Sequence, residues 1–334
     1  FRRVLFRSAP LGPGQGSWPL FQKNLQHTGT TTAAGPTCGK VLWSTKLRGK
    51  ILASASLVHN EILGGDELYV PVGKAPVCAL DPASGGVNWC GTDNTGKSVD
   101  RSAPAVGNGH LLYVGTRDND LWAINVAQDK QKPNVEWRQK ICTDGDVTTP
   151  PAIGPNGVVY MGSDSLGGGT IMAMCPGSTR QIKWCVNPLG GGVKNVSPAV
   201  NTTNTIVYVT HDGAYLTALD TATGTVHWDI QIEDRRNGLR GSNYTPVIDP
   251  TTGKVYVGFD EGIYQVTPPA SAQVTMRSGT GPARRPMTPT TALRCRRSES
   301  STPHRSSTAP GGASAGRSSA AALFSAWSLR ACDK

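Results

Sequence analysis

The stretch ALDTATGTVHW, at residues 218–228, decides the fold of this chain, because a near copy, ALDPASGGVNW, stands 139 residues earlier at 79–89. Each copy has a short apolar piece, a polar turn that contains glycine, and a second apolar piece that ends in tryptophan. Two near copies in one chain indicate an internal repeat, and the period of a repeat is the first thing to establish.

Two kinds of aromatic residue keep one period. The tryptophans recur at steps of 46, 48, 47 and 44 residues, at Trp43, Trp89, Trp137, Trp184 and Trp228. A second series of tyrosines steps by 44, 47, 48 and 48 residues, at Tyr69, Tyr113, Tyr160, Tyr208 and Tyr256. Because the two series are independent markers, their agreement indicates one structural unit that is repeated.

Each unit holds four short apolar pieces. The first follows or includes a proline (SAPAVG, YTPVI), the second contains the tyrosine (LLYVG, KVYVG), the third reads LWAIN or LTALD, and the fourth ends in tryptophan. The pieces are rich in Val, Ile, Leu and Tyr and are bounded by Gly, Asp, Asn or Pro, which is typical of strands and turns. Residues 43–266 show no convincing helical period. Four short antiparallel strands in every 40 to 50 residues predict the blade of a β-propeller.

The quoted stretch fits the last hairpin of such a blade. Ala79 and Ala218 are small where side chains of another blade must approach, Gly85 and Gly224 make the turn, and the tryptophan places a large apolar plate between blades. We interpret the motif as packing rather than as a binding site. Its predicted structural docking residues are Trp43, Ala79, Asp81, Gly85, Trp89, Trp137, Trp184, Ala218, Asp220, Gly224 and Trp228.

This motif, AxDxxTGxxxW, resembles the docking motif of the quinoprotein-dehydrogenase-like propellers, which are built of pyrroloquinoline-quinone-like repeats. The segment WPLFQKNLQHTGTT, at 18–31, is similar to the one that leads into such propellers. The resemblance covers residues 18–266 and implies a ring of seven or eight blades. We therefore expect an all-β, incomplete propeller of about five blades within 18–268, with units near 43–89, 90–137, 138–184, 185–228 and 229–266.

The two ends of the chain read differently from the repeats. Residues 1–17 are expected to be an artefactual or disordered leader, since FRRVLFRS resembles a translated library adaptor. Residues 269–334 lack strand alternation and replace Lys by Arg, so we expect a frameshifted or disordered tail that adds no blade. These ends carry +3 (residues 1–8) and +8 (269–334) of the net charge of +10, and residues 9–268 carry −1. The repeat region thus offers no basic face for nucleic acid.

Cysteines of the repeat region predict disulfides. If Ala79 pairs with Trp89, then Cys78 faces Cys90 across the hairpin at a distance that suits a bond. Cys175 and Cys185 bracket the corresponding hairpin of the third unit and are the second candidate pair. Disulfides would place the protein in an oxidising compartment, periplasmic or extracellular. The alternative is free cysteines buried in strands.

The sequence contains no pattern of catalytic residues. The spacing CxxC is absent, the histidines show no ligand or triad spacing, and we interpret Asp118–Asp120 as a turn rather than as part of a calcium loop. Catalytic and metal residues are therefore predicted to be none. No segment of 18 apolar residues is present, so no transmembrane segment is expected.

Two classes of function remain open. The first is a non-catalytic propeller that binds a protein or cell-wall partner and has no cofactor. The second, implied by the resemblance, is a fragment of a dehydrogenase of alcohols or sugars that uses pyrroloquinoline quinone and calcium. We favour the first, because the units are uniform and the resemblance provides no quinone or calcium ligand that can be placed here. Counting strands leaves an orphan last strand at 41–44, and predicts an open arc with two exposed sheet faces.

Overall fold

A computed structural model of the chain describes residues 18–32, 39–60, 64–73, 75–91, 101–107, 110–126, 134–142, 145–164, 169–177, 180–186, 191–233, 244–260 and 262–268. Within these ranges the chain forms strands and no α-helix. The strands are β1 (Ser56–Asn60), β2 (Gly65–Val72), β3 (Ala75–Leu80), β4 (Val87–Cys90), β5 (Ala105–Val106), β6 (Leu111–Gly115), β7 (Asp120–Asn125), β8 (Asn134–Lys140), β9 (Ala152–Ile153), β10 (Val159–Ser163), β11 (Thr170–Met174), β12 (Ile182–Val186), β13 (Ala199–Val200), β14 (Ile206–His211), β15 (Tyr215–Asp220), β16 (Val226–Gln231), β17 (Val247–Ile248), β18 (Val255–Gly258) and β19 (Ile263–Val266).

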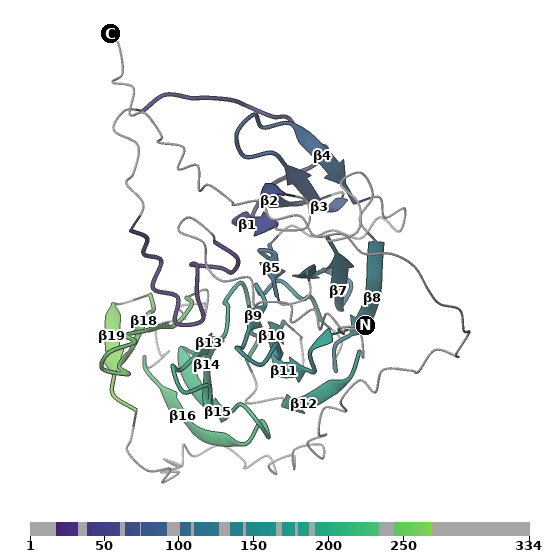
Figure 1. The fold of residues 1–334 in the computed structure, drawn as a ribbon. Coiled ribbons are helices and arrows are strands. Elements are labelled where there is room, and N and C mark those ends of the chain that lie inside the picture. The colour runs from purple at the N-terminus through teal and green to yellow at the C-terminus, as the bar shows by residue number, and fades with distance from the viewer. Residues whose placement is uncertain are drawn as a thin grey trace, which may run out of the picture.

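These strands make five antiparallel sheets, each a meander of consecutive strands. Four sheets have four strands, β1–β4, β5–β8, β9–β12 and β13–β16, and the fifth has three, β17–β19. The sheets follow one another around an arc that leaves the ring open, with β1, β5, β9 and β13, the first strands of the four-stranded sheets, toward the centre (Figure 1). The prediction of an incomplete all-β propeller is therefore confirmed, and the five sheets are blades 1 to 5 in chain order. The predicted tail at 269–334 and the leader at 1–17 lie outside the described residues.

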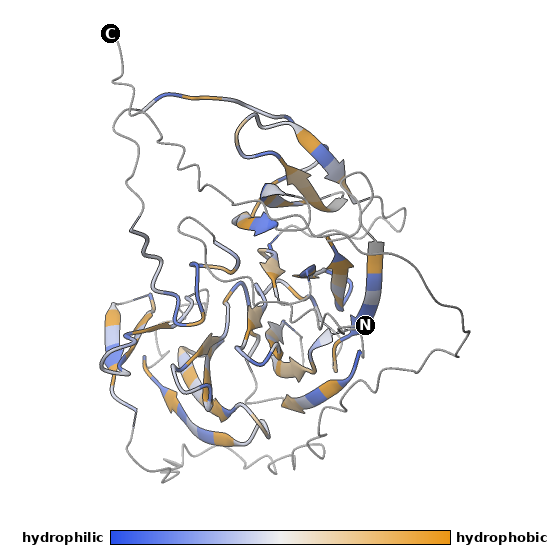
Figure 2. Ribbon diagram, viewed as in Figure 1, coloured by the Kyte–Doolittle hydropathy of each residue, from blue (hydrophilic) through white to orange (hydrophobic). Residues whose placement is uncertain are grey.

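Stacking of the blades explains why the middle strands read as continuous apolar runs. Every residue of β6, β10 and β11 is buried, because a neighbouring blade covers each face of these strands. The outer strand β12 has buried Trp184 between half-buried residues, and β16 also buries its tryptophan, Trp228. Figure 2 shows the same contrast, with apolar colour concentrated on the inner part of each blade and alternation along the outer strands.

The hydrophobic core is divided into layers that lie between blades. One cluster joins blades 1 and 2 around Tyr69 and Trp122, and the next joins blades 2 and 3 around Tyr113 and Met172. Two further clusters join blade 3 to blade 4 and blade 4 to blade 5. Since each blade completes the core of the next one, the fold is a chain of pairwise interfaces, in which no single blade buries its own apolar faces.

A segment at residues 18–29, here called the inner segment, connects the blades along their innermost strands. Trp18 pairs with Leu57 of β1, and the Pro19 carbonyl accepts a hydrogen bond from Val106 of β5. Farther along, the carbonyls of Leu25 and Gln26 accept hydrogen bonds from Val200 of β13 and Ile248 of β17. The inner segment therefore bonds directly to four of the five blades, which explains why this stretch is part of the fold and not a leader.

His27 provides the last contact of the inner segment, and it has a consequence for stability. Its ring is buried and its Nδ1–H donates to the Pro246 carbonyl at 2.9 Å, and burial lowers the pKa of His27 from 6.5 to about 4. The unfolded chain therefore binds more protons than the folded chain between these two pKa values. The contribution of neutral His27 to the free energy of unfolding is therefore fully present above about pH 6.5, and it is lost as the pH falls toward 4.

We expect this single group to account for a loss of up to about 3 kcal/mol of unfolding free energy between pH 6.5 and pH 4. Chemical denaturation across this range, compared with His27→Gln, measures the contribution. The variant should be less stable at pH 7 and should show a flatter profile. Identical slopes for the two proteins would rule out the buried neutral histidine as the cause.

Residues 41–47 run beside blade 1 as an extended segment, here called the orphan segment. No strand is assigned to the predicted orphan strand at 41–44, because within the described residues it has no backbone partner. Its side chains Trp43 and Leu47 pack, with Ala55, on the face of blade 1 that turns away from blade 2. The expectation of two bare sheet faces is thus wrong for blade 1. It holds for blade 5, where Ile263 of β19 is 84% exposed.

Candidate functional site

The tyrosine and tryptophan series of the sequence meet in each of the first four blades. Across blade 1 the register aligns Ser56, Tyr69, Ala79 and Trp89 in one row, and the equivalent rows exist in blades 2, 3 and 4. Since residues in a row share one face of the sheet, the alanine leaves space over which the two rings approach. The ring centroids of tyrosine and tryptophan are 5.8–6.0 Å apart in all four blades.

The tryptophan of one blade reaches the last hairpin of the following blade. Trp184 Nε1 of blade 3 donates to the Thr221 carbonyl of blade 4 at 3.0 Å, and Trp137 donates to the Gly177 carbonyl at 3.2 Å. Asp220 shapes that hairpin, because its carboxylate accepts hydrogen bonds from the backbone of Ala222 and Thr223. Asp81 makes the same turn in blade 1. The two tryptophans thus bond across to the neighbouring blade, whereas Asp81 and Asp220 are partly exposed and bond within their own hairpins.

The glycine of the hairpin is required by both its backbone and its surroundings. Gly224 has φ +75°, and a Cβ on it would lie 2.7 Å from Trp184 Cδ2. Gly85 has φ +73°, and a Cβ on it would overlap the ring of Trp43. Glycine is the residue that allows the left-handed turn and the flat ring above it at the same time.

Gly224→Ala is expected to cost about 2–4 kcal/mol, of which about 1–2 is backbone strain and the rest overlap with Trp184. Gly253→Ala is the matched control, because Gly253 has φ +70° in a turn of the same sequence type but its Cβ would meet nothing within 4 Å. Chemical denaturation of both variants separates the two effects. Equal losses would show that the ring exerts no steric demand.

The buried tyrosines of the rows are packing groups and not acids or bases. Burial raises the pKa of Tyr113 and of Tyr160 to about 12 in each case. The pKa of Tyr69 is raised still further, by burial first and by the neighbouring Glu67 carboxylate second. The phenols therefore keep their protons at any physiological pH.

The structure pairs four of the cysteines in two disulfides, one within blade 1 and one between blades 2 and 3. Cys78 and Cys90 are joined across the last hairpin of blade 1, with a Cα separation of 4.0 Å. The predicted pairing of Cys175 with Cys185 is wrong, because Cys185 is joined to Cys142, with a Cα separation of 6.4 Å. The register gives the reason: Cys185 follows the tryptophan as Cys90 does, but the residue opposite to it is Met172. Cys175, two residues beyond the alanine of the row, is also disulfide-bonded.

A hollow of about 600 Å³ opens where the chain enters the innermost strands, here called the axial hollow. Phe21 of the inner segment and the residues that precede β1, β5, β9 and β13 line it: Ile51, Leu52, Ala53, Ser54, Arg101, Ala103, Pro150 and Asn195. Ile51 and Leu52 are about half exposed, and Arg101 supplies the one charged side chain of the lining. The described lining thus combines apolar side chains with Ser54, Asn195 and one cation, and it contains no carboxylate.

Hydrogen bonds that involve side chains also join the stretches that precede the innermost strands of successive blades. Ser102 Oγ donates to the Thr149 carbonyl at 2.9 Å, which ties the entrance of blade 2 to that of blade 3. Ser197 N donates to Thr245 Oγ1 at 3.1 Å, which does the same for blades 4 and 5. The sequence marked these stretches only as pieces near a proline. It gave no sign that they converge, because they are about 47 residues apart in the chain.

Charged groups also meet on the loops of blades 3 and 4. Lys194 Nζ lies 3.3 Å from Asp164 Oδ1 and 3.1 Å from Asp212 Oδ2. Burial alone would lower the pKa of Lys194, but the two carboxylates outweigh it and raise the pKa. With its charge matched by carboxylates on both blades, Lys194 links the blades as an ion pair.

In the described ranges no three or more His, Cys, Asp or Glu side chains gather in a way that could hold a metal ion.

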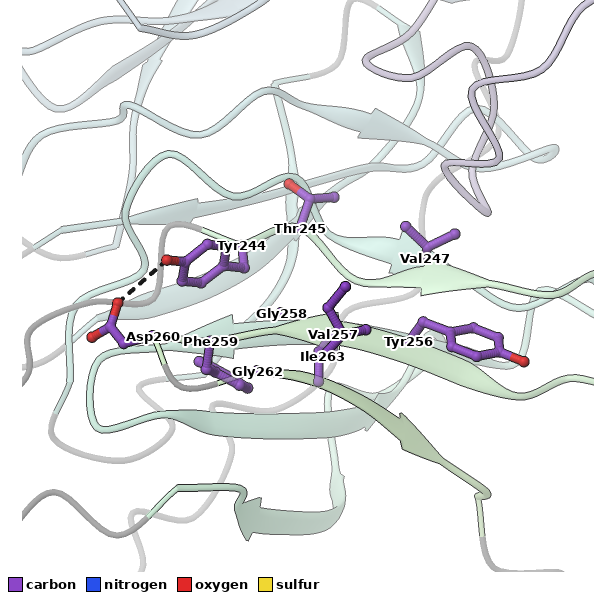
Figure 3. Close-up of a pocket in the computed structure, with 10 residues that line it drawn as sticks. All are labelled: Tyr244, Thr245, Val247, Tyr256, Val257, Gly258, Phe259, Asp260, Gly262 and Ile263. Carbon is purple, nitrogen blue, oxygen red and sulfur yellow. Dashed lines mark hydrogen bonds between the residues drawn. The ribbon is translucent and has the colours of Figure 1, made fainter.

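The second hollow, of about 550 Å³, lies on the open face of blade 5 (Figure 3). Tyr244, Val247, Tyr256 and Phe259 line it together with the turn that leads into β19. The Tyr244 hydroxyl donates to Asp260 at 3.3 Å, as the dashed line in Figure 3 shows. In blade 5 the register aligns Val247, Tyr256 and Gln265 as the equivalent row, and Val247 and Tyr256 line this hollow. The hollow therefore lies on the face that, in blades 1 to 4, packs against the following blade. Among the described residues there is no helix with the length and apolar character needed to cross a membrane.

Comparisons with known proteins agree with the repeat. A family model described as "Outer membrane protein assembly factor BamB" matches residues 134–285. Comparison with curated proteins gave no match. A quinohemoprotein alcohol dehydrogenase from Comamonas testosteroni has a similar structure, with 16% identity, a TM-score of 0.57, and coverage of 75% of this chain and 49% of that chain.

A europium-containing methanol dehydrogenase is similar at 15% identity and a TM-score of 0.57, with coverage of 74% of this chain and 57% of that chain. BamB from Moraxella catarrhalis has 16% identity and a TM-score of 0.40, and the coverage is 57% of this chain and 53% of that chain. The chain thus spans about half the length of the structures to which it is similar. The recurring row and hairpin, together with the two dehydrogenase structures, show that the chain has the fold of a β-propeller, and its residues 134–285 match a model of the pyrroloquinoline-quinone-like repeats.

Proposed function

We propose that the protein is a non-catalytic binding or scaffold propeller that acts in the cell envelope or outside the cell. The observation that carries this proposal is the lining of the axial hollow. Its exposed apolar side chains Ile51 and Leu52, with Arg101 beside them, suit a protein surface that offers an apolar anchor and an acidic group. The name of the matched family model, an assembly factor of the outer membrane, supports the same class of function.

The disulfides support the compartment. Cys78–Cys90 and Cys142–Cys185 both form within the repeats, and structural disulfides persist mainly in oxidising environments such as the periplasm and the extracellular space. A partner that is a protein or a cell-wall component would meet the propeller there.

The second candidate is a dehydrogenase of alcohols or sugars that uses pyrroloquinoline quinone and calcium, and the two similar dehydrogenase structures make it worth testing. Calcium requires about six to eight oxygen ligands, usually with carboxylates among them. The described lining of the axial hollow offers Ser54 and Asn195 but no carboxylate, so these residues do not fit the group. We derive no catalytic step from it.

Titration of the full chain with the quinone and calcium separates the two candidates. The quinone absorbance should show no saturable shift, and no alcohol or sugar should be oxidised with an artificial electron acceptor. Saturable binding at a 1:1 ratio together with turnover would overturn the proposal.

A photo-crosslinking amino acid at Leu52 tests the binding role directly. In an extract of envelope components it should give one discrete adduct, which the addition of Arg101→Glu weakens because the charge of the lining is reversed. The same group at exposed Thr203, on a loop between β13 and β14, is the control and should give no such adduct. Equal labelling from both positions would reject the hollow as the binding site.

A further inference from the structure

The orphan segment occupies the position of the outer strand of a blade. Trp43 Nε1 donates to the Pro82 carbonyl of blade 1 at 3.0 Å, as Trp184 donates to the corresponding hairpin of blade 4. Thr45 Oγ1 adds a hydrogen bond of 2.6 Å to the Gly85 carbonyl. Its side chains alternate, with Trp43, Thr45 and Leu47 half-buried and the residues between them exposed. This is the burial pattern of a strand that lies on blade 1.

The backbone of this segment is available for pairing. Among the described residues, no backbone hydrogen bond joins residues 41–47 to any strand. Val41 and Leu42 are 81% and 82% exposed, which is unusual for two consecutive large apolar side chains. An extended edge with free N–H and C=O groups and apolar side chains is a template for another strand.

Blade 5 has fewer strands than the other four blades in the described part of the chain. Its described strands are β17, β18 and β19, and the outer edge of β19 has no fourth strand beside it in the described part of the chain. In the other four blades a fourth strand that contains the tryptophan covers this edge. Within the described residues, blade 5 therefore has an edge without an outer strand, while the orphan segment is an outer strand without a blade.

The register of the complete blades predicts how these two parts would pair. In blade 1 the tryptophan lies opposite the alanine of the row, and Cys90 lies opposite Cys78. The equivalent of that alanine in blade 5 is Gln265, which pairs with Tyr256. Trp43 would therefore lie opposite Gln265, and Ser44 opposite Tyr264.

Charge complementarity agrees with this register. Arg48 lies four positions beyond Ser44, so the added strand would carry it past the start of β19, toward the turn between Phe259 and Gly262 that contains Asp260. The described residues 39–50 carry only positive charges, from Lys40, Lys46, Arg48 and Lys50. Asp260 lies at the rim of the hollow on the open face of blade 5 (Figure 3).

We infer that a second copy of this chain is the partner of this surface: the orphan segment of one copy adds to β19 of the other as the fourth strand of its blade 5. Blade 1 of the first copy then covers the hollow lined by Tyr244, Val247 and Tyr256 of the second. The contact is head-to-tail, because the donor strand and the acceptor edge are different surfaces of one chain. It goes beyond the proposed function, since no partner of another kind is needed.

The disulfide of blade 1 provides the design of the test. Ser44→Cys with Tyr264→Cys places two cysteines in the relation that Cys90 and Cys78 have in blade 1. Under mild oxidation of the full chain we expect a disulfide between residues 44 and 264 of different copies, identified by peptide mass spectrometry. Ser44→Cys with Gln265→Cys is the control, because neighbouring residues of a strand point to opposite faces, and it should give no such bond.

A second pair of variants keeps the test valid if Tyr264→Cys disturbs folding. Both Arg48 and Asp260 are exposed, so the fold tolerates their exchange. Sedimentation velocity over a range of concentrations should show self-association, weakened about fivefold or more by Arg48→Glu and restored by Arg48→Glu with Asp260→Arg. A constant monomer mass at all concentrations, or a disulfide that forms only within one chain, overturns the inference.

Discussion

Trp184→Ala is expected to lower the free energy of unfolding by about 3–5 kcal/mol, as usual for the loss of a buried tryptophan. The side chain is 2% exposed, its ring lies 6.0 Å from that of Tyr160, and its indole donates to the Thr221 carbonyl of the next blade. Its removal would open a cavity between blades 3 and 4 and leave that carbonyl without this donor. Chemical denaturation followed by tryptophan fluorescence measures the loss.

Trp184→Phe is the matched control for this result. Phenylalanine keeps an aromatic plate over Gly224 but cannot donate to Thr221, so about 1–3 kcal/mol should be lost. If the two variants were equally stable, the hydrogen bond and not the packed ring would hold the blades together.

Removal of the disulfide between blades 2 and 3, by Cys142→Ala with Cys185→Ala, should cost about 4 kcal/mol. The bond closes a loop with a sequence separation of 43 residues, and the entropy that it removes from the unfolded chain rises with loop length. Cys78→Ala with Cys90→Ala is the control, because the separation there is 12 and the expected cost is about 3 kcal/mol.

Both double variants should be compared with the parent protein by urea denaturation under oxidising conditions. The expected order is parent, then the variant that lacks Cys78–Cys90, then the variant that lacks Cys142–Cys185. The reverse order would mean that loop length does not govern the stabilisation, and that local packing around Cys78 matters more.

The repeat allowed the sequence to predict more than the fold class. Because Tyr69, Ala79 and Trp89 recur with one spacing, the blades and the hairpin glycines could be located from the letters alone. The same alignment also shows why the predicted pairing of Cys175 with Cys185 was wrong. Cys185 follows its tryptophan as Cys90 does, whereas Cys175 follows the alanine of its row by two residues and Cys78 precedes its own by one.

The sequence by itself determined the blades, since strand length, turn residues and the tyrosine and tryptophan positions are local and periodic. Only the tertiary structure decided which parts of different blades meet. The partner of Cys185, the path of residues 18–29 along the inner strands and the lining of the axial hollow depend on contacts between residues far apart in the chain. Periodicity determines the strands and turns of each blade. The contacts between blades depend instead on how the blades stack around an axis.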